Sequence, residues 1–336
     1  MHIATATATG SAHINPGQPG KINNQDALVV KKLANGHIVV LSDGCGSQPY
    51  SGIGADIGAN IIARVIDQHL SKISSLKQIN WGSITKDVQD NLRLGVNLFT
   101  SNNSADLESV VVERFLFTVM IVITTDNLAM IVSFGDGIVI IDDKVISIES
   151  PILNSPPYLG YMLLKDSAYH TKKLSSYLAF SVVKTIDLSK LKKGLIVGTD
   201  GLKDLMHEDL HHPSLVQPKT LQRWLNALTS EKIHNGSFIT GKCSDDVSMV
   251  IIRTDKAQDR LLKSRREVAE LKREIARLQS ELTTAVESLK KAEASREETE
   301  KNLADLRQIQ IRTAMPYSDP IHSATKQISK RFWFSR

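Results

Sequence analysis

Residues 37–46 read HIVVLSDGCG, a run of branched apolar side chains that ends in Asp43 and Gly44. Val, Ile and Leu in such a run favour an extended strand. The glycine lets backbone oxygens come close to a ligand, and the strand holds the carboxylate rigidly. Because hard cations prefer oxygen ligands, this pattern predicts a strand over His37–Leu41 with a metal-binding carboxylate just after it.

The same pattern occurs at four other places, each of which sets an Asp beside a run rich in Val, Ile and Leu. They are Asn24-Gln25-Asp26, Gly135-Asp136-Gly137, Asp200-Gly201-Leu202-Lys203-Asp204 and Asp245-Asp246. A single Asp-Gly pair is usually an ordinary turn. Brought together, Asp43, Asp200 and Asp245 would repel one another without cations, and oxygen ligands suit Mg²⁺ or Mn²⁺. The ordered set therefore predicts a pocket with more than one metal ion, which can activate a bridging water for attack on phosphorus.

Short apolar runs separated by turn residues predict a strand-rich first part of the chain. Helical spacing of apolar residues predicts helices from Gly52 to Leu70 and from Trp81 to Phe99. The expected strands are Ala27–Val30, His37–Leu41, Thr118–Thr124, Leu128–Phe134, Ile138–Ile141, Lys144–Ile148, Leu195–Val197 and Val247–Arg253. Turns are expected at Asn35-Gly36 and Asp142-Asp143. The pattern indicates an α+β fold in which an antiparallel sheet core is flanked by helices.

The character of the sequence changes after Thr254, where a heptad repeat begins. Its a positions are Leu261, Val268, Ile275, Leu282, Leu289, Arg296 and Leu303, and its d positions are Ser264, Leu271, Leu278, Ala285, Ala292, Thr299 and Leu306. This repeat predicts a coiled-coil helix over residues 256–312, paired with a second copy or with a partner's helix. The alternative is one long helix folded back on the preceding domain.

Three segments are therefore expected: a domain over residues 1–255, the coiled-coil helix over 256–312, and a flexible basic and aromatic tail over 313–336. The tail contains Arg331, Phe332 and Trp333. Such a tail suits docking on a protein, an acidic membrane surface or a nucleic acid. A disordered terminus is the alternative.

Charge and composition exclude several classes of protein. Of 41 Lys and Arg and 36 Asp and Glu, 18 and 12 lie beyond residue 255, which leaves 23 and 24 in the first domain. A domain without excess positive charge is not a nucleic-acid-binding surface. Two cysteines, Cys45 and Cys243, are too few for a disulfide framework. We see neither a secretory signal nor a membrane span, so a cytoplasmic location is the default expectation.

Residues 10–255 resemble the metal-dependent Ser/Thr protein phosphatases of type 2C, the PPM family, through the ordered acidic motifs. The resemblance implies a sandwich of two antiparallel β-sheets flanked by α-helices. It also implies hydrolysis of phosphoserine or phosphothreonine by a water or hydroxide that bridges two metals, without a phosphoenzyme. The implied cofactors are two or three Mn²⁺ or Mg²⁺ ions. The implied partners are a Ser/Thr-phosphorylated protein substrate and a cognate kinase.

The resemblance also assigns roles to individual residues. Asp43 is expected to bridge the two metals, and the Gly44 carbonyl to bind one of them. Asp200 and Asp245 complete the shell of the other metal, and Asp26 orients metal-bound water. Asp136 and Asp204 match positions that, with Asp200, hold a third metal in bacterial members. Ser51 and Gly52 match small residues that begin the helix behind the first metal turn.

Three positions depart from the family pattern. Gln25 replaces a metal-binding Glu, which removes one negative charge and predicts weaker binding of one ion. Lys21 replaces an Arg that grips the substrate phosphate, and lysine lacks the bidentate fork. Cys45 replaces the His of the eukaryotic branch. These departures leave a second hypothesis open: a catalytically weak, phosphatase-like protein that binds phosphoproteins or serves as a scaffold through its coiled coil.

Overall fold

The structure, a computed structural model, describes residues 1–13, 24–100, 104–150, 156–164, 177–206, 208–229, 232–234, 237–239 and 243–314. The chain forms two compact units, Met1–Arg265 and Arg266–Arg336. Lys21 and residues 315–336 lie outside the described residues, and with them the predictions for the phosphate-binding lysine and for most of the tail.

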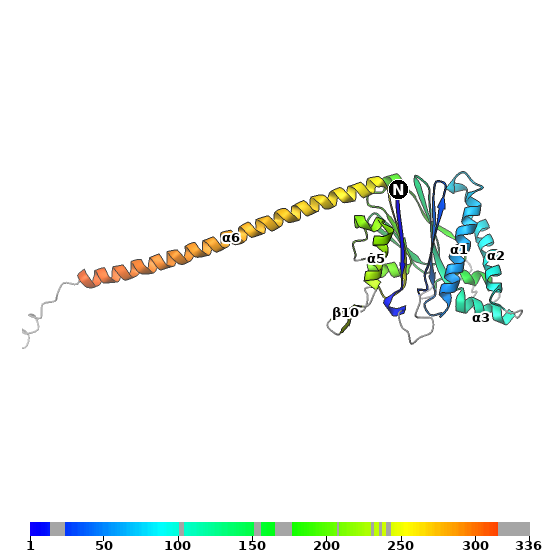
Figure 1. The fold of residues 1–336 in the computed structure, drawn as a ribbon, viewed down its shortest axis with the longest axis horizontal. Helices are drawn as coiled ribbons and strands as arrows, with labels where there is room; N and C mark the ends of the chain where they lie inside the picture. The colour runs from blue at the N-terminus through cyan, green and yellow to red at the C-terminus, as the bar shows by residue number, and fades with distance from the viewer. Residues whose placement is uncertain are drawn as a thin grey trace, which may run out of the picture. The chain divides into compact units, whose positions relative to one another are not determined.

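Two five-stranded antiparallel sheets form the centre of the first unit (Figure 1). The first sheet has the order β1-β12-β9-β6-β7, made of β1 (His2–Ala8), β12 (Val247–Arg253), β9 (Leu195–Gly198), β6 (Gly137–Ile141) and β7 (Lys144–Ile148). The second has the order β2-β3-β4-β5-β8, made of β2 (Ala27–Leu33), β3 (Gly36–Gly44), β4 (Phe117–Thr124), β5 (Leu128–Phe134) and β8 (Ser181–Asp187). A short separate hairpin joins β10 (Lys232–His234) to β11 (Ser237–Ile239).

Helices cover the outer faces of both sheets. On the second sheet lie α1 (Ser51–Leu70), α2 (Trp81–Asn97) and α3 (Ser104–Arg114), whereas α5 (Pro218–Thr229) packs on the first (Figure 1). Each interface has its own apolar core, and a third core lies between the sheets. The architecture is therefore a four-layer sandwich, helix on sheet on sheet on helix.

Strand β4 shows why the central strands read as unbroken apolar runs. All eight of its residues are buried. Val119, Ile121 and Ile123 belong to the core under the helices, whereas Met120 and Val122 belong to the core between the sheets. Because side chains alternate between the faces of a strand, a strand covered on both faces needs apolar residues at every position.

The expected α+β sandwich of two antiparallel sheets with flanking helices is confirmed. Each expected strand and both expected helices are present, and the turn at Asp142-Asp143 joins β6 to β7. The first hairpin differs by one residue, because Leu33 pairs with Gly36 and the turn consists of Ala34 and Asn35. The sequence prediction did not include β1, α3, β8 or α5.

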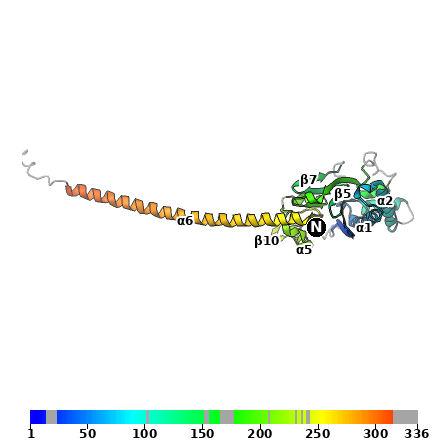
Figure 2. The ribbon, with the colours of Figure 1, turned by 90° about the horizontal axis from the view of Figure 1, so that it is seen from above.

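The expected long C-terminal helix is also confirmed. Helix α6 (Asp255–Ala314) is continuous over 60 residues (Figure 2). All its side chains from residue 262 to 313 are exposed. Within the described part of the chain, no helix has the length and apolar character required to cross a bilayer. Pairing of α6 with another helix stays a prediction.

Candidate functional site

Strand ends from both sheets meet around one pocket of about 380 Å³. Asp43 is the penultimate residue of β3, and Asp136 lies in the connection by which β5 of one sheet leads to β6 of the other. Asp200 follows β9, and Asp245 precedes β12. The described lining residues are Asp43, Cys45, Gly46, Asp136, Glu149, Ser150, Pro156, Tyr158, Asp200, Lys203 and Asp245. The fold therefore gathers four of the predicted aspartates, which lie as much as 202 residues apart in sequence.

Mutual repulsion shows that these carboxylates act on one another. Burial, followed by the charges of Asp26, Asp200, Asp245 and Asp136, raises the pKa of Asp43 well above its usual range. Burial and the charge of Asp200 also raise the pKa values of Asp136 and Asp245. Raised pKa values mean that the ionised pocket is destabilised as it stands, and a bound cation would relieve this.

The Gln25-Asp26 segment is fixed by hydrogen bonds that leave oxygens available. Gln25 Nε2 donates to the Gln48 carbonyl at 2.6 Å, and Asp26 Oδ2 accepts from Thr199 Oγ1 at 2.9 Å. The Thr199 hydroxyl also accepts the Ser248 N–H at 3.0 Å. Burial, followed by the charge of Asp246, raises the pKa of Asp26 well above its usual range.

Among the residues that the structure describes, three buried oxygens in this region find no hydrogen-bond partner: Gln25 Oε1, Asp26 Oδ1 and Asp136 Oδ1. Buried acceptors are normally satisfied, and oxygens of this kind suit Mg²⁺ or Mn²⁺. The residues present therefore fit divalent cations. No three acidic, histidine or cysteine side chains within the described ranges form a ready-made metal-binding group. The carboxylates share a pocket but are not closed around an ion position.

Gly44 and Ser51 explain the tight packing behind the Asp43 turn. A Cβ atom on Gly44 would lie 2.6 Å from the Gln25 carbonyl oxygen and 2.9 Å from Ser51 Oγ. Ser51, the first residue of α1, donates from Oγ to the Cys45 carbonyl at 3.0 Å. A side chain at position 44 would push the Gln25 segment away, so the close approach itself requires glycine.

Asp204 is placed differently from the other predicted aspartates. It is exposed and is not among the pocket-lining residues. Its Oδ2 accepts the backbone N–H and the hydroxyl of Ser244, both at 2.9 Å. Its visible role is to fix the loop that leads to Asp245.

The sequence interpretation gave Asp246 a supporting role beside Asp245 and not that of a metal ligand, but it did not identify the residues that Asp246 contacts or the involvement of His13. Asp246 is buried, and its two carboxylate oxygens accept the N–H groups of Gly10 at 2.8 Å and Gln25 at 2.6 Å. His13 Nδ1 lies 2.8 Å from Asp246 Oδ2, and His13 Nε2 lies 3.6 Å from Asp245 Oδ1. Asp246 thus ties together the end of β1, the Gln25-Asp26 segment and the start of β12. No sequence periodicity marks such a junction.

We predict that Asp246→Asn destabilises the domain by about 1–3 kcal/mol, the cost of an unsatisfied buried polar group. An amide has one oxygen, so the N–H of Gly10 or Gln25 would face an NH₂ group. Urea unfolding of the two proteins measures the change, with Asp56→Asn on the exposed face of α1 as the matched control. If Asp246→Asn and the control were equally stable, the hydrogen bonds of Asp246 to Gly10 and Gln25 would not stabilise the domain as proposed.

The two cysteines are buried and not paired with each other. Cys45 lines the pocket, and its Sγ lies 3.2 Å from Ser47 Oγ. Cys243 Sγ contacts the carbonyl oxygens of Asp245 at 3.2 Å and Gly201 at 3.4 Å. Burial, followed by the charge of Asp204, raises the pKa of the Cys243 thiol to about 12. Burial and these two carbonyl contacts fit a packing role for the Cys243 thiol.

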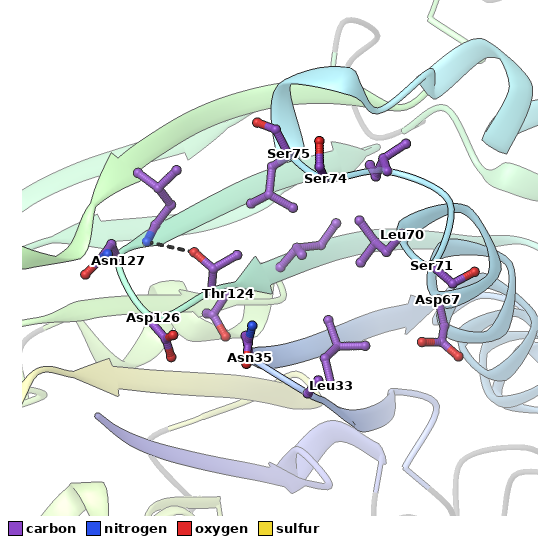
Figure 3. A pocket seen from close by; sticks show the side chains of 16 residues that line it. Leu33, Asn35, Asp67, Leu70, Ser71, Ser74, Ser75, Thr124, Asp126 and Asn127 are labelled. Carbon is purple, nitrogen blue, oxygen red and sulfur yellow. Dashed lines mark hydrogen bonds between the residues drawn. The ribbon is translucent and has the colours of Figure 1, made fainter.

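A larger pocket of about 700 Å³ lies at the other end of strands β3 and β4. It forms where the turns that contain Asn35 and Asp126 lie beside the end of α1 at Leu70 (Figure 3). Asp67 and Asp126 are the charged residues among its described lining, and they belong to separate elements. This pocket lacks the convergent carboxylates of the smaller one, so the smaller pocket is the candidate functional site.

Comparisons with solved structures return bacterial phosphatases at low similarity. The Ser/Thr phosphatase Stp1 from Staphylococcus aureus is 13% identical, with a TM-score of 0.40, and the match covers 76% of this chain and 96% of that one. The catalytic domain of the Ser/Thr protein phosphatase PstP, solved with two manganese ions, is 14% identical, with a TM-score of 0.41 and coverage of 74% and 96%. PppA, a regulatory component of a secretion system in Pseudomonas aeruginosa, is 13% identical, with a TM-score of 0.42 and coverage of 75% and 98%.

Structural similarities with TM-scores this low do not by themselves support an assignment of family or function. No curated protein sequence matches the chain. The sequence model of one family, described as protein phosphatase 2C, matches residues 9–235, which is more than half of the chain and contains four of the five acidic motifs. The chain belongs to the protein phosphatase 2C family.

Proposed function

We propose that this chain hydrolyses phosphoserine and phosphothreonine in proteins with the help of Mn²⁺ or Mg²⁺. One observation carries the proposal: Asp43, Asp136, Asp200 and Asp245 line one pocket, where their charges repel one another. Family membership supplies the class of reaction. The unpartnered oxygens of Gln25, Asp26 and Asp136 support divalent cations as the missing positive charge.

We assign the ligand roles as follows: Asp43 shared by two ions, Gly44 through its carbonyl, Gln25 on one side, and Asp200 and Asp245 on the other. Ions bound there would neutralise the phosphoryl oxygens and activate water for in-line attack. Asp136, whose carboxylate interacts with the charge of Asp200, is the proposed ligand of a third ion together with Asp200 and Asp204. Gln25 contributes no charge, so we expect its ion to be the most easily lost.

The chain's own residues would orient the reactants. Asp26 is held through Oδ2 by the Thr199 hydroxyl, and its buried Oδ1, which has no hydrogen-bond partner among the described residues, is the atom proposed to orient a water beside Asp43. Lys21 is proposed to hold the substrate phosphate as a point charge. Positioning and electrostatics of this kind account for most of phosphoryl-transfer catalysis, because little covalent chemistry is asked of the protein.

The test is a comparison of phosphopeptide hydrolysis with MnCl₂ and with a chelator. We expect release of phosphate from phosphoserine and phosphothreonine peptides only when Mn²⁺ is present, and little release from a phosphotyrosine peptide. Thermal unfolding with and without Mn²⁺ provides a second readout, since a ligand that binds the folded state raises the unfolding temperature. Binding of Mn²⁺ without any turnover would favour the scaffold hypothesis instead.

A further inference from the structure

Helix α6 carries an apolar stripe at the a and d positions from Val268 to Leu306, interrupted at Arg296 and Thr299. Side chains 262–313 of α6 are all exposed, and Leu271, Leu282 and Leu289 are 63–65% exposed. The other large exposed side chains at a and d positions are Val268, Ile275, Leu278, Leu303 and Leu306. A helix that repeats apolar residues every 3.5 positions gains most of its stability from a partner along that seam.

We propose that residues 261–306 of two copies of this chain pair as a parallel, in-register, two-stranded coiled coil. The residue types along the seam favour two parallel strands, because β-branched Val268 and Ile275 occupy a positions while Leu271 and Leu278 occupy d positions. This proposal does not depend on the catalytic assignment.

Charges beside the seam agree with a parallel second copy. In a parallel pair each g residue faces the e residue five positions later on the other helix. Glu267 then faces Lys272 of the other copy, twice per dimer. The other pairs are Glu274 with Gln279, Glu281 with Val286, Ser288 with Glu293, Ser295 with Glu300 and Asn302 with Arg307. None of these six pairs brings like charges together. At the start of the repeat Arg260 faces Arg265 of the other copy, and Arg265 is paired with Asp209 of its own chain.

Antiparallel registers bring fewer of the apolar a and d side chains into contact with one another. The register that pairs Val268 with Leu306 along the whole stripe also sets Leu278 against Arg296 and Ile275 against Thr299. A shorter register that pairs Leu271 with Leu289 leaves Leu303 and Leu306 without apolar partners. The parallel register pairs each apolar layer with itself, and its weak point is confined to Arg296 and Thr299. We therefore expect the two helices to be stably paired before residue 293 and less stably paired beyond it.

Both chains enter such a coil at the same end. A dimer then offers two copies of the catalytic pocket to one multiply phosphorylated protein, which raises the effective affinity without any new contact in the pocket.

The oligomeric state of the full chain is the first test. Light scattering is expected to give twice the chain mass of 37.1 kDa, and the double variant Leu271→Glu/Leu278→Glu is expected to give the monomer mass. The matched control, Arg273→Glu/Ser280→Glu, adds the same two carboxylates at outward f positions and should stay dimeric. A monomeric wild-type chain, or a dimer that survives the double variant, would overturn the proposal.

Orientation is tested by cross-linking. Leu271→Cys should form a disulfide-linked dimer under mild oxidation, because only a parallel in-register pair brings residue 271 next to its own copy. Arg273→Cys, two residues away on the outer face, should not form one. The native Cys45 and Cys243 are buried, so the unmodified chain gives the background. A dimer in which Leu271→Cys fails to cross-link would overturn the parallel register.

A different observation carries a second inference, which concerns Lys203 in the pocket. Five carboxylates line the pocket, from Asp43, Asp136, Glu149, Asp200 and Asp245. Lys203 is the one cationic side chain among its described lining residues. Its Nζ lies 3.9 Å from Asp200 Oδ2, which is at the limit of an ion pair, and the side chain is half exposed. The ammonium group therefore keeps donors available to the pocket.

We infer that Lys203 binds the phosphate of the substrate, an inference that rests on the proposed function. The acidic residues of the pocket are the proposed ligands of the metal ions, so Lys203 is the side chain of the described lining that can add an ammonium donor to a phosphate where the pocket is open to solvent. Lys203→Met is expected to raise KM for a phosphothreonine peptide about tenfold with little change in kcat, because the contact is made before and during reaction. Lys203→Arg should restore most of the loss.

Binding of inorganic phosphate to the Mn²⁺-loaded protein provides a readout apart from turnover. We expect about tenfold weaker phosphate binding by Lys203→Met, while Lys219→Met, an exposed lysine on α5 outside the pocket, behaves as wild type. Unchanged phosphate binding together with tighter Mn²⁺ binding would show that Lys203 only balances Asp200, and would overturn the inference. A wild-type chain that binds phosphate but hydrolyses no peptide would instead count against the proposed function.

Discussion

Replacement of Asp43 by asparagine is expected to abolish metal-dependent turnover and, at the same time, to stabilise the metal-free protein. Asp43 is repelled by Asp26, Asp200, Asp245 and Asp136, and burial adds to the cost of its charge. An amide of the same shape removes that cost. We expect a loss of about 10³-fold or more in kcat, the scale of a principal electrostatic contact. The metal-free variant is expected to unfold at a higher urea concentration than wild type, because it no longer carries a buried charge that its neighbours repel.

Thermal unfolding of both proteins with and without Mn²⁺ separates these effects. Mn²⁺ should raise the unfolding temperature of the wild-type protein. The metal-free Asp43→Asn protein should unfold at a higher temperature than metal-free wild type, and Mn²⁺ should change that temperature little. Asp126→Asn, an exposed residue in the other pocket, changes the net charge equally and should match wild type in both assays. If Asp43→Asn lowered the stability of the metal-free protein, the carboxylate would be a structural group and the electrostatic account would be wrong.

A large loss of stability is expected when Gly54 is replaced by alanine. Gly54 lies in α1, where the helix packs against the junction of α3 and β4. A Cβ atom at this position would lie 2.0 Å from the Arg114 carbonyl oxygen and 2.6 Å from the Phe115 Cα. Both are backbone atoms, so the contact can be relieved only by moving the helix. We expect Gly54→Ala to cost about 3 kcal/mol, at the upper end of the usual range for overpacking. For a domain of this size that lowers the unfolding temperature by roughly 6–12 °C.

Gly95 on α2 provides the matched control for Gly54→Ala. A Cβ atom there would lie 3.5 Å from the Ile57 Cγ2 atom, an ordinary contact. Alanine in a helix interior is favoured over glycine by about 0.5–1 kcal/mol, so Gly95→Ala should stabilise the domain. Calorimetry should show a lower unfolding temperature for Gly54→Ala and a higher one for Gly95→Ala, each relative to wild type. A Gly54→Ala protein as stable as Gly95→Ala would show that α1 does not lie as close to Arg114 as described.

The central strands could be predicted from sequence because both of their faces are buried. Strands β3, β4 and β12 therefore contain runs of three to five consecutive apolar residues, such as Val119–Ile123 in β4. The missed elements lack this signal. Strand β1 alternates Ala and Thr, so its apolar face consists of small residues such as Ala4 and Ala6. Strand β8 lies at a sheet edge with most side chains outward, and its Val182 is exposed.

The site could be predicted in part, for a similar reason. An Asp after an apolar strand is a local signal, so Asp43, Asp136 and Asp200 could be recognised as candidates one at a time. Their convergence depends on how the two sheets pack, which no local pattern encodes. For the same reason the sequence could not separate Asp204, which turns away to Ser244, from Asp136, which lines the pocket. It also gave no sign that Lys203 lines the pocket, and it marked Asp246 as a supporting residue without showing which segments it joins.

Anomalous scattering from crystals soaked in MnCl₂ tests the central claim most directly, because it locates the cations that the pocket is proposed to hold. We predict manganese peaks within coordination distance of the carboxylate oxygens of Asp43, Asp200 and Asp245, and their disappearance in Asp43→Asn. Crystals of protein that hydrolyses phosphothreonine peptides, yet shows no manganese at these oxygens, would contradict the account.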